Sequence, residues 1–130
     1  MVTDNALTLL GLALRGNHLA VGEAGVEEAC KARRAALVLS AADAAQNSVD
    51  RAGRWAQAGG APWVRLPWDK ETLGAALGRR TCAMAALTDR GLAAALAGRL
   101  AQRDEGLRPI ASQLEEQKKP RAQKPAPCES

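Results

Sequence analysis

Aromatic side chains are almost absent from this sequence of 130 residues. Phe and Tyr do not occur, and three Trp supply the whole aromatic fraction of 2%. Hydrophobic residues still make up 47% of the chain, with 29 Ala and 17 Leu, which is enough to form a core and excludes disorder throughout. Because Ala buries little surface, helices and strands must pack closely, with Leu, Val and Trp filling the gaps. The length is typical of one domain.

Residues that build metal centres and catalytic triads are equally scarce. His18 is the single histidine, and the three cysteines, Cys30, Cys82 and Cys128, form no Cys-x-x-Cys pair. These counts argue against a zinc site, a disulfide scaffold and a histidine-based triad. The glycine spacings of the common phosphate-binding loops are also missing. We therefore expect no metal, no cofactor and no enzymatic activity, with Cys30 and Cys82 serving as small buried side chains.

Long apolar runs are missing as well. No stretch approaches the roughly 20 apolar residues of a membrane-spanning helix, and residues 1–5 lack the basic start of a signal peptide. We expect a reduced, cytoplasmic location without a membrane partner. The high content of Ala and Arg is typical of a GC-rich genome.

What the sequence does contain is a regular alternation of helix and strand patterns. Apolar residues at helical spacing, such as Leu7, Leu10 and Leu14, predict five helices, and short apolar runs between them predict four strands. The helices are expected before residue 16 and at 23–34, 43–59, 69–77 and 89–100, and the strands at 18–22, 35–40, 62–66 and 81–87. Such an alternation is typical of an α/β fold with helices on both faces of a sheet.

Three aspartates lie between a predicted strand and the helix that follows it. Asp43, Asp69 and Asp89 could line a cleft at the strand ends, as carboxylates do in α/β enzymes. Their regular position favours another role, in which each side chain accepts backbone N–H bonds as the N-cap of its helix. We expect capping at all three positions.

The C-terminal segment differs in composition from the rest of the chain. From residue 101 onward Gln, Lys, Glu and Pro dominate, and residues 117–127 contain three prolines and no apolar period. Such a segment buries too little apolar surface to offset the entropy cost of ordering it. We expect one domain at 1–100 and a disordered, basic, Pro-containing tail at 101–130, within which a short helix could form at 110–117.

The charge is mildly basic, with 18 Lys and Arg against 14 Asp and Glu. Two groups of cations stand out: Lys31, Arg33 and Arg34 at the end of the second predicted helix, and Arg79 and Arg80 before the fourth strand. Favourable interaction with helix C-termini explains both groups, whereas contacts to RNA phosphates would give them a function.

The tryptophans have two interpretations as well. Trp55 is expected in the core. Trp63 and Trp68 flank the third predicted strand and could stack on bases, but packing in or around the core is the favoured role.

Several short runs occur in an order and spacing shared with a known family. They are Leu-Leu-Gly-Leu-Ala at 9–13, Val-Gly at 21–22, the run at 35–43, Ala-Pro-Trp-Val-Arg-Leu at 61–66, and the runs at 73–78 and 85–92. Over residues 5–98 this series resembles the kink-turn RNA-binding ribosomal protein family, of the L-seven-Ae and L-thirty-e type, and most closely its bacterial YlxQ-like branch. The resemblance implies a three-layer α/β/α sandwich with a four-stranded mixed sheet. It also implies a noncatalytic, ribosome-associated RNA-binding protein.

In that family, RNA contacts come from the start of the second helix and from the loop before the last strand. The helix opens with a Gly-x-Asn-Glu-x-x-Lys pattern, in which Asn and Glu read base edges and Lys neutralises phosphate. Here Gly22 matches, but Ala24, Gly25 and Glu28 stand at the Asn, Glu and Lys positions. The usual base-reading residues are therefore missing, and binding would be mainly electrostatic. The candidate RNA-binding residues are Gly22, Glu23, Ala24, Gly25, Lys31, Arg33, Arg34, Arg79, Arg80 and Thr81.

A second hypothesis keeps the fold but gives it another role. Glu23, Glu27 and Glu28 make the second predicted helix acidic, so it could meet a basic protein partner. A contiguous positive patch joining the arginine pairs at 33–34 and 79–80 would favour structured RNA as the partner. Scattered cations around an acidic helix would favour a protein. We expect a monomer in either case.

Overall fold

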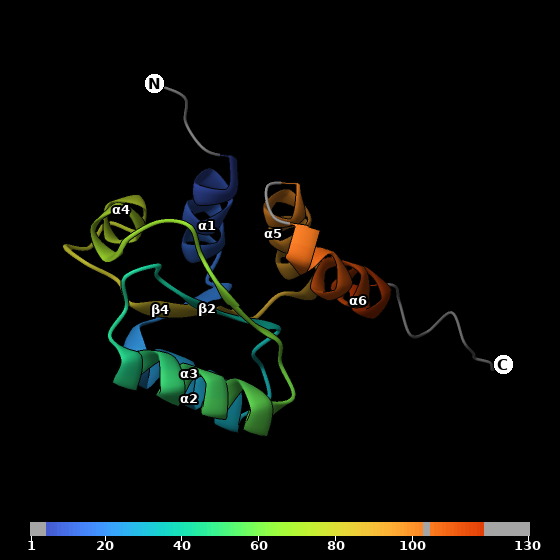
Figure 1. Cartoon of the computed structure of the whole chain (residues 1–130), viewed down its shortest axis with the longest axis horizontal. Coiled ribbons are helices and arrows are strands. Elements are labelled where there is room, and N and C mark those ends of the chain that lie inside the picture. The colour runs from blue at the N-terminus through green and yellow to red at the C-terminus, as the bar shows by residue number, and fades with distance from the viewer. Residues whose placement is uncertain (1–4, 103–104, 119–130) are drawn as a thin grey trace, which may run out of the picture.

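The protein forms three layers, with helices on both faces of a four-stranded sheet (Figure 1). The computed structural model describes residues 5–102 and 105–118. The elements follow in the order α1 (Asn5–Arg15), β1 (Leu19–Val21), α2 (Gly22–Lys31), β2 (Leu37–Ser40), α3 (Gln46–Gly59), β3 (Trp63–Arg65), α4 (Lys70–Ala76), β4 (Met84–Leu87), α5 (Arg90–Ala101), the 3₁₀ turn η1 (Glu105–Leu107) and α6 (Arg108–Lys118). The predicted α/β class and mixed sheet are confirmed, with six α-helices among the described residues instead of about five.

The last strand in the sequence lies inside the sheet. The strand order is β1-β4-β2-β3, so β4 is flanked by β1 and β2. It pairs antiparallel with both of them, while β2 pairs parallel with β3. None of the helices in the described ranges is both long enough and apolar enough to cross a membrane.

A large apolar cluster joins one face of the sheet to α1, α4, α5 and α6. Successive side chains of β2 point to opposite faces of the sheet. Leu37 and Leu39 therefore point into the large cluster, while Val38 points to the opposite side. Leu10 of α1 and Leu96 of α5 are fully buried against it. Trp68 also packs against this cluster.

The smaller cluster on the opposite face, under α2 and α3, consists mainly of small side chains: Val26, Ala29, Cys30, Val38, Ala52, Ala56, Met84 and Ala86. These side chains let the two helices approach closely, and a Cβ on Gly59 would lie only 2.7 Å from the carbonyl oxygen of Cys30. Trp55 and Trp63 pack against the cluster. Nε1 of Trp63 donates to Oγ of the buried Ser40 at 2.8 Å. The expected packing role of the tryptophans is confirmed.

The segment after residue 100 is folded further than we expected. α6 packs along α5, with Leu114 fully buried and with Leu107 and Ile110 packed against the large cluster. The prediction of a disordered tail is therefore wrong for residues 105–118, and the domain extends beyond residue 100. Although this segment is mostly polar, one face of α6 is apolar. Burial of that face offsets the entropy cost of ordering the segment. Residues 119–130 lie outside the described residues.

Two helices begin with the expected aspartate caps. Oδ1 of Asp69 accepts the amide hydrogen of Thr72 at 2.7 Å, at the start of α4. Oδ2 of Asp89 accepts that of Leu92 at 2.8 Å, at the start of α5. Each cap satisfies a backbone donor that has no partner within the helix.

The prediction that Asp43 caps the third helix is wrong. α3 begins later, with Ala45 at its N-cap and no side-chain bond there. Oδ1 of Asp43 instead accepts the backbone N–H of Lys70 at 2.8 Å. The aspartate therefore joins the loop after β2 to the start of α4, a role that depends on how distant segments meet.

Candidate nucleic-acid interface

The sheet has two ends, and each gathers a different set of loops. At one end β1 and β2 finish while β4 begins, because Val21 lies opposite Ala85 and Ser40 lies opposite Met84. This Val21 end carries the start of α2 and the loop between α4 and β4. At the opposite end, the Leu87 end, β4 finishes and α2 terminates. Figure 1 shows the loop between α4 and β4 on the left, and the chain leaving β4 toward α5 on the right.

The ten predicted site residues are divided between these two ends. The Val21 end holds Gly22, Glu23, Ala24, Gly25, Arg79, Arg80 and Thr81. Lys31, Arg33 and Arg34 lie at the Leu87 end, because α2 with its ten residues spans about 15 Å between the two groups. The two arginine pairs therefore lie at opposite ends of the sheet, separated by the length of α2.

The loop between α4 and β4 is held in a fixed path. The backbone N–H of Arg79 donates to the carbonyl oxygen of Gly74 at 2.7 Å. A Cβ on Gly74 would lie 2.6 Å from Cα of Thr81, so only glycine fits there without displacing the loop. Arg79 and Arg80 are exposed on this loop, and neither forms an ion pair with any described residue.

Cys82 connects the end of this loop to α4 and β4. Its backbone N–H donates to the carbonyl oxygen of Lys70 at 3.0 Å, and its thiol donates to that of Met84 at 3.2 Å. Burial raises the pKa of the Cys82 thiol, and this effect outweighs the hydrogen bonds to the backbone of Met84 and Gly22 and the positive charge of Arg79. Val21, the residue before α2, pairs with Ala85 of β4, so the start of α2 and the loop that leads into β4 lie side by side at this end of the sheet.

α2 begins without a side-chain cap. Val21 occupies the N-cap position with extended backbone angles, φ −116° and ψ 134°, and makes no side-chain cap bond. Gly22 follows with φ 89°, in the left-handed region that favours glycine. With Ala24 and Gly25 next along the chain, this turn presents backbone amides and small surfaces, and Glu23 is its one polar side chain.

Glu23 is neutralised by residues that the sequence did not reveal. Its Oε2 accepts hydrogen bonds from Nη2 of Arg51 at 2.9 Å and from Oγ of Ser48 at 3.1 Å. The hydrogen bond from Arg51 is the main cause that lowers the pKa of Glu23, and Ser48 adds to it. Ser48 and Arg51 are 25 and 28 residues away in the sequence, so only the packing of α2 against α3 brings them together.

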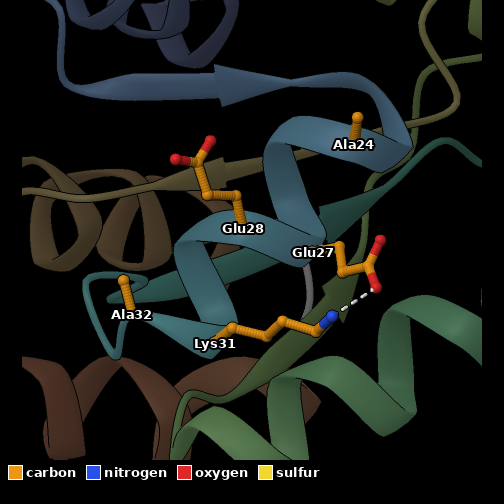
Figure 2. A pocket seen from close by; sticks show the side chains of 5 residues that line it. All are labelled: Ala24, Glu27, Glu28, Lys31 and Ala32. Atoms are coloured by element: carbon orange, nitrogen blue, oxygen red, sulfur yellow. Dashed lines mark ion pairs between the residues drawn. The ribbon is translucent and has the colours of Figure 1, made fainter.

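The outer face of α2 carries paired charges beside a shallow, open hollow. Nζ of Lys31 lies 2.9 Å from Oε2 of Glu27, and Nη2 of Arg34 lies 4.0 Å from Oε2 of Glu28. Figure 2 shows the hollow, with the ion pair along one side; it is lined by Ala24, Glu27, Glu28, Lys31 and Ala32. Because each acid of this helix has a cation nearby, the helix predicted to be acidic is close to neutral.

Metal-binding side chains do not gather within the described ranges. No group of three or more His, Cys, Asp or Glu residues there could hold a metal ion. Cys30 and Cys82 are free and buried, as expected. Burial raises the pKa of the Cys30 thiol.

Comparison with known proteins supports the fold without supplying a function. No protein-family model matches the chain, and no curated protein matches it. Among solved structures, the chain is similar to a protein of unknown function from Bacillus halodurans C, with 26% sequence identity and a TM-score of 0.69. The match covers 75% of this chain and 97% of the other. Nearly all of that protein therefore shares this fold, and about a quarter of the present chain lies outside the match.

Proposed function

We propose that this is a noncatalytic, ribosome-associated RNA-binding protein whose Val21 end contacts structured RNA. The proposal is carried by the position of Arg79 and Arg80, which are exposed and form no ion pair with described residues, on the loop beside the start of α2. RNA affinity arises largely from cations that neutralise phosphates. Adjacent guanidinium groups on a fixed loop, beside a helix start, suit a phosphate backbone.

The ribosomal association rests on the resemblance of residues 5–98 to the kink-turn RNA-binding family. In that family RNA is contacted by the same two segments that lie side by side here. The proposal includes a cytoplasmic monomer, as the sequence leads us to expect. It excludes strong kink-turn recognition, because Ala24, Gly25 and Glu28 replace the side chains that read base edges in the family. Binding should therefore be mainly electrostatic and weakly specific.

A pair of double variants tests which end of the sheet binds RNA. Arg79→Ala/Arg80→Ala removes both loop cations. The matched control removes two cations from the Leu87 end as Arg33→Asn/Arg34→Ala, with Asn at position 33 because Arg33 has φ 58° and Asn tolerates the left-handed region. Binding to one labelled structured RNA is titrated with salt. The loop variant should bind about tenfold more weakly, and its log–log salt slope should flatten by roughly 0.7–0.9 for each phosphate that is no longer neutralised.

Two outcomes would overturn the proposal. If the control loses affinity while the loop variant binds like the parent, RNA is bound at the Leu87 end. If neither variant differs from the parent, the arginine pairs are not the source of affinity, and a protein partner becomes the better explanation.

The alternative function is a protein-interaction module on the same fold. It is favoured by one observation, the separation of the two arginine pairs to opposite ends of the sheet. The hollow on the outer face of α2 would then be the natural contact region. The pairing of Glu27 and Glu28 with cations weakens its attraction for a basic partner. For this reason RNA remains the proposed ligand.

A further inference from the structure

Arg51, a charged residue of α3, is hydrogen-bonded to the first turn of α2. Nη2 of Arg51 and Oγ of Ser48 both donate to Oε2 of Glu23, at 2.9 and 3.1 Å. Glu23 lies two residues after Val21, which pairs with Ala85 near the start of β4. The polar cluster of Glu23, Ser48 and Arg51 therefore adjoins the surface proposed to contact RNA.

The guanidinium of Arg51 is only partly used by this cluster. The side chains of Arg51 and Glu23 are 40% and 44% exposed, so both charges remain within reach of a ligand. Arginine offers five N–H donors. In the described part of the chain, Nη2 bonds to Glu23, while the buried Nε has no hydrogen-bond partner. Because the side chain is partly exposed and only Nη2 is used, the terminal nitrogens of Arg51 have capacity left for another oxygen ligand.

We infer that Arg51 is a third phosphate-binding arginine of the Val21 end, and that Glu23 limits its strength by competing with phosphate for the guanidinium. The inference rests on the proposed function and states how the affinity of that site is set. Carboxylate and phosphate oxygens both pair with guanidinium in a forked geometry, so they compete for the same donors. While Glu23 holds Arg51, the pair presents little net charge to RNA.

Three variants separate competition from a merely structural role. Glu23→Gln removes the competing charge and keeps the shape, so affinity for a labelled RNA duplex with an internal loop should rise about threefold or more. The salt slope should steepen by about 0.7–0.9, because one more phosphate is neutralised. Arg51→Gln leaves Glu23 unpaired and should weaken binding by about the same factor. The double variant has the net charge of the parent and should bind within about twofold of it.

Ser48→Ala is the matched control. It removes one hydrogen bond from Glu23 but changes no charge, so RNA affinity should stay within about twofold of the parent. Thermal melting of every variant shows whether α2 and α3 still pack. If Glu23→Gln and Arg51→Gln both weaken binding, in step with their melting temperatures, the cluster only holds the helices together and the inference is wrong.

A titration with inorganic tripolyphosphate distinguishes failure of this inference from failure of the proposed function. The readout is the NMR resonance of the Arg51 Nε–H group. We expect it to shift on titration, at lower tripolyphosphate concentration in Glu23→Gln than in the parent. If RNA does not bind but this order holds, the proposed function fails and the inference stands. If the resonance does not move, or Glu23→Gln does not tighten binding, the inference fails even where RNA binds.

Discussion

The two ends of the sheet both carry a pair of arginines, but they hold them differently. At the Leu87 end, Lys31 and Arg34 lie near Glu27 and Glu28, at the C-terminal end of α2, where the helix dipole already favours cations. At the Val21 end, residues 79–80 lie on a loop beyond the end of α4 and have no acidic partner among the described residues. Two of the three cations in the 31–34 group are paired with acids, whereas Arg79 and Arg80 form no ion pair with described residues.

This difference shows that a count of cations is a poor guide to a binding surface. The sequence places more basic residues in the 31–34 group than in the 79–80 group. In the described part of the structure, acids lie beside Lys31 and Arg34 but not beside Arg79 and Arg80, so the count overstates the charge that the 31–34 group leaves free. Variants that alter one end of the sheet and leave the other intact therefore test whether the Val21 end alone binds RNA.

The largest effect is expected from Leu114→Ala, which alters stability away from the Val21 end. Leu114 is fully buried where α6 packs on α5. The cavity should cost about 2–5 kcal/mol, lowering the melting temperature by roughly 10 °C or more. The exposed Ser112→Ala on the same helix should stay within about 0.5 kcal/mol of the parent. RNA affinity, measured where the variant is folded, should not change, and a loss of affinity would show that the two regions are coupled.

The next effect concerns the path of the loop at the Val21 end. Gly74→Ala would place a Cβ against the backbone of Thr81 and should cost about 1–3 kcal/mol. Gly53→Ala on α3 is the matched control, because a Cβ there meets nothing within 4 Å; it should gain up to about 1 kcal/mol. Chemical denaturation gives both values. RNA binding should weaken in Gly74→Ala alone, and equal binding by both variants would show that the loop path does not matter.

A smaller effect is expected when the missing base readers are introduced. The variant Ala24→Asn/Gly25→Glu/Glu28→Lys completes the family pattern after Gly22. A Cβ at position 25 meets only ordinary contacts, the nearest at 3.4 Å to Ala20, so the helix should accept it. Preference for a kink-turn over a plain duplex should rise about tenfold, or ~1.4 kcal/mol. Glu28→Lys alone should strengthen both complexes equally. An unchanged preference in the triple variant would mean that the RNA face lies elsewhere.

The smallest effect concerns the charge on the α4 cap at the Val21 end. Hydrogen bonds from Thr72 lower the pKa of Asp69 from its ordinary value of 3.8. A lowered pKa stabilises the fold above the ordinary value, and this contribution is lost as the pH falls through the folded-state value. The melting temperature of Asp69→Asn should therefore lie slightly below that of the parent at pH 7, and the gap should close as the pH falls below about 4. A gap independent of pH would exclude a role for the charge.

Much of the fold could be predicted because its signals are local. Apolar spacing located five helices and four strands, and Asp69 and Asp89 marked the start of α4 and α5. A short helix at 110–117 was allowed, but the packing of α6 on the domain was not predicted, because the polar and Pro-containing composition outweighed the spacing of Leu107, Ile110 and Leu114. That spacing was the available signal. It becomes stabilising only against the surface of α5, which composition does not describe.

The candidate site was less predictable, because partners that are distant in the sequence determine which of its charges are neutralised. The resemblance located the two segments that meet at the Val21 end. It could not show that Arg51 neutralises Glu23, since these residues are 28 positions apart and joined only by helix packing. Asp43 was misassigned for the same reason, as its partner Lys70 comes from another loop.

The position of β4 inside the sheet has a consequence for how the chain acquires its structure. β1 and β2 do not pair with each other; β1 pairs only with β4, and β4 joins it to the β2–β3 pair. A nascent chain that ends before Met84 therefore has the parallel β2–β3 pair at most, with β1 left unpaired. Long-range strand pairing is slow because a large loop must close first. The domain should thus fold late in its own synthesis, after residue 87 has left the ribosomal tunnel, and its arginine-bearing loop takes shape at the same moment.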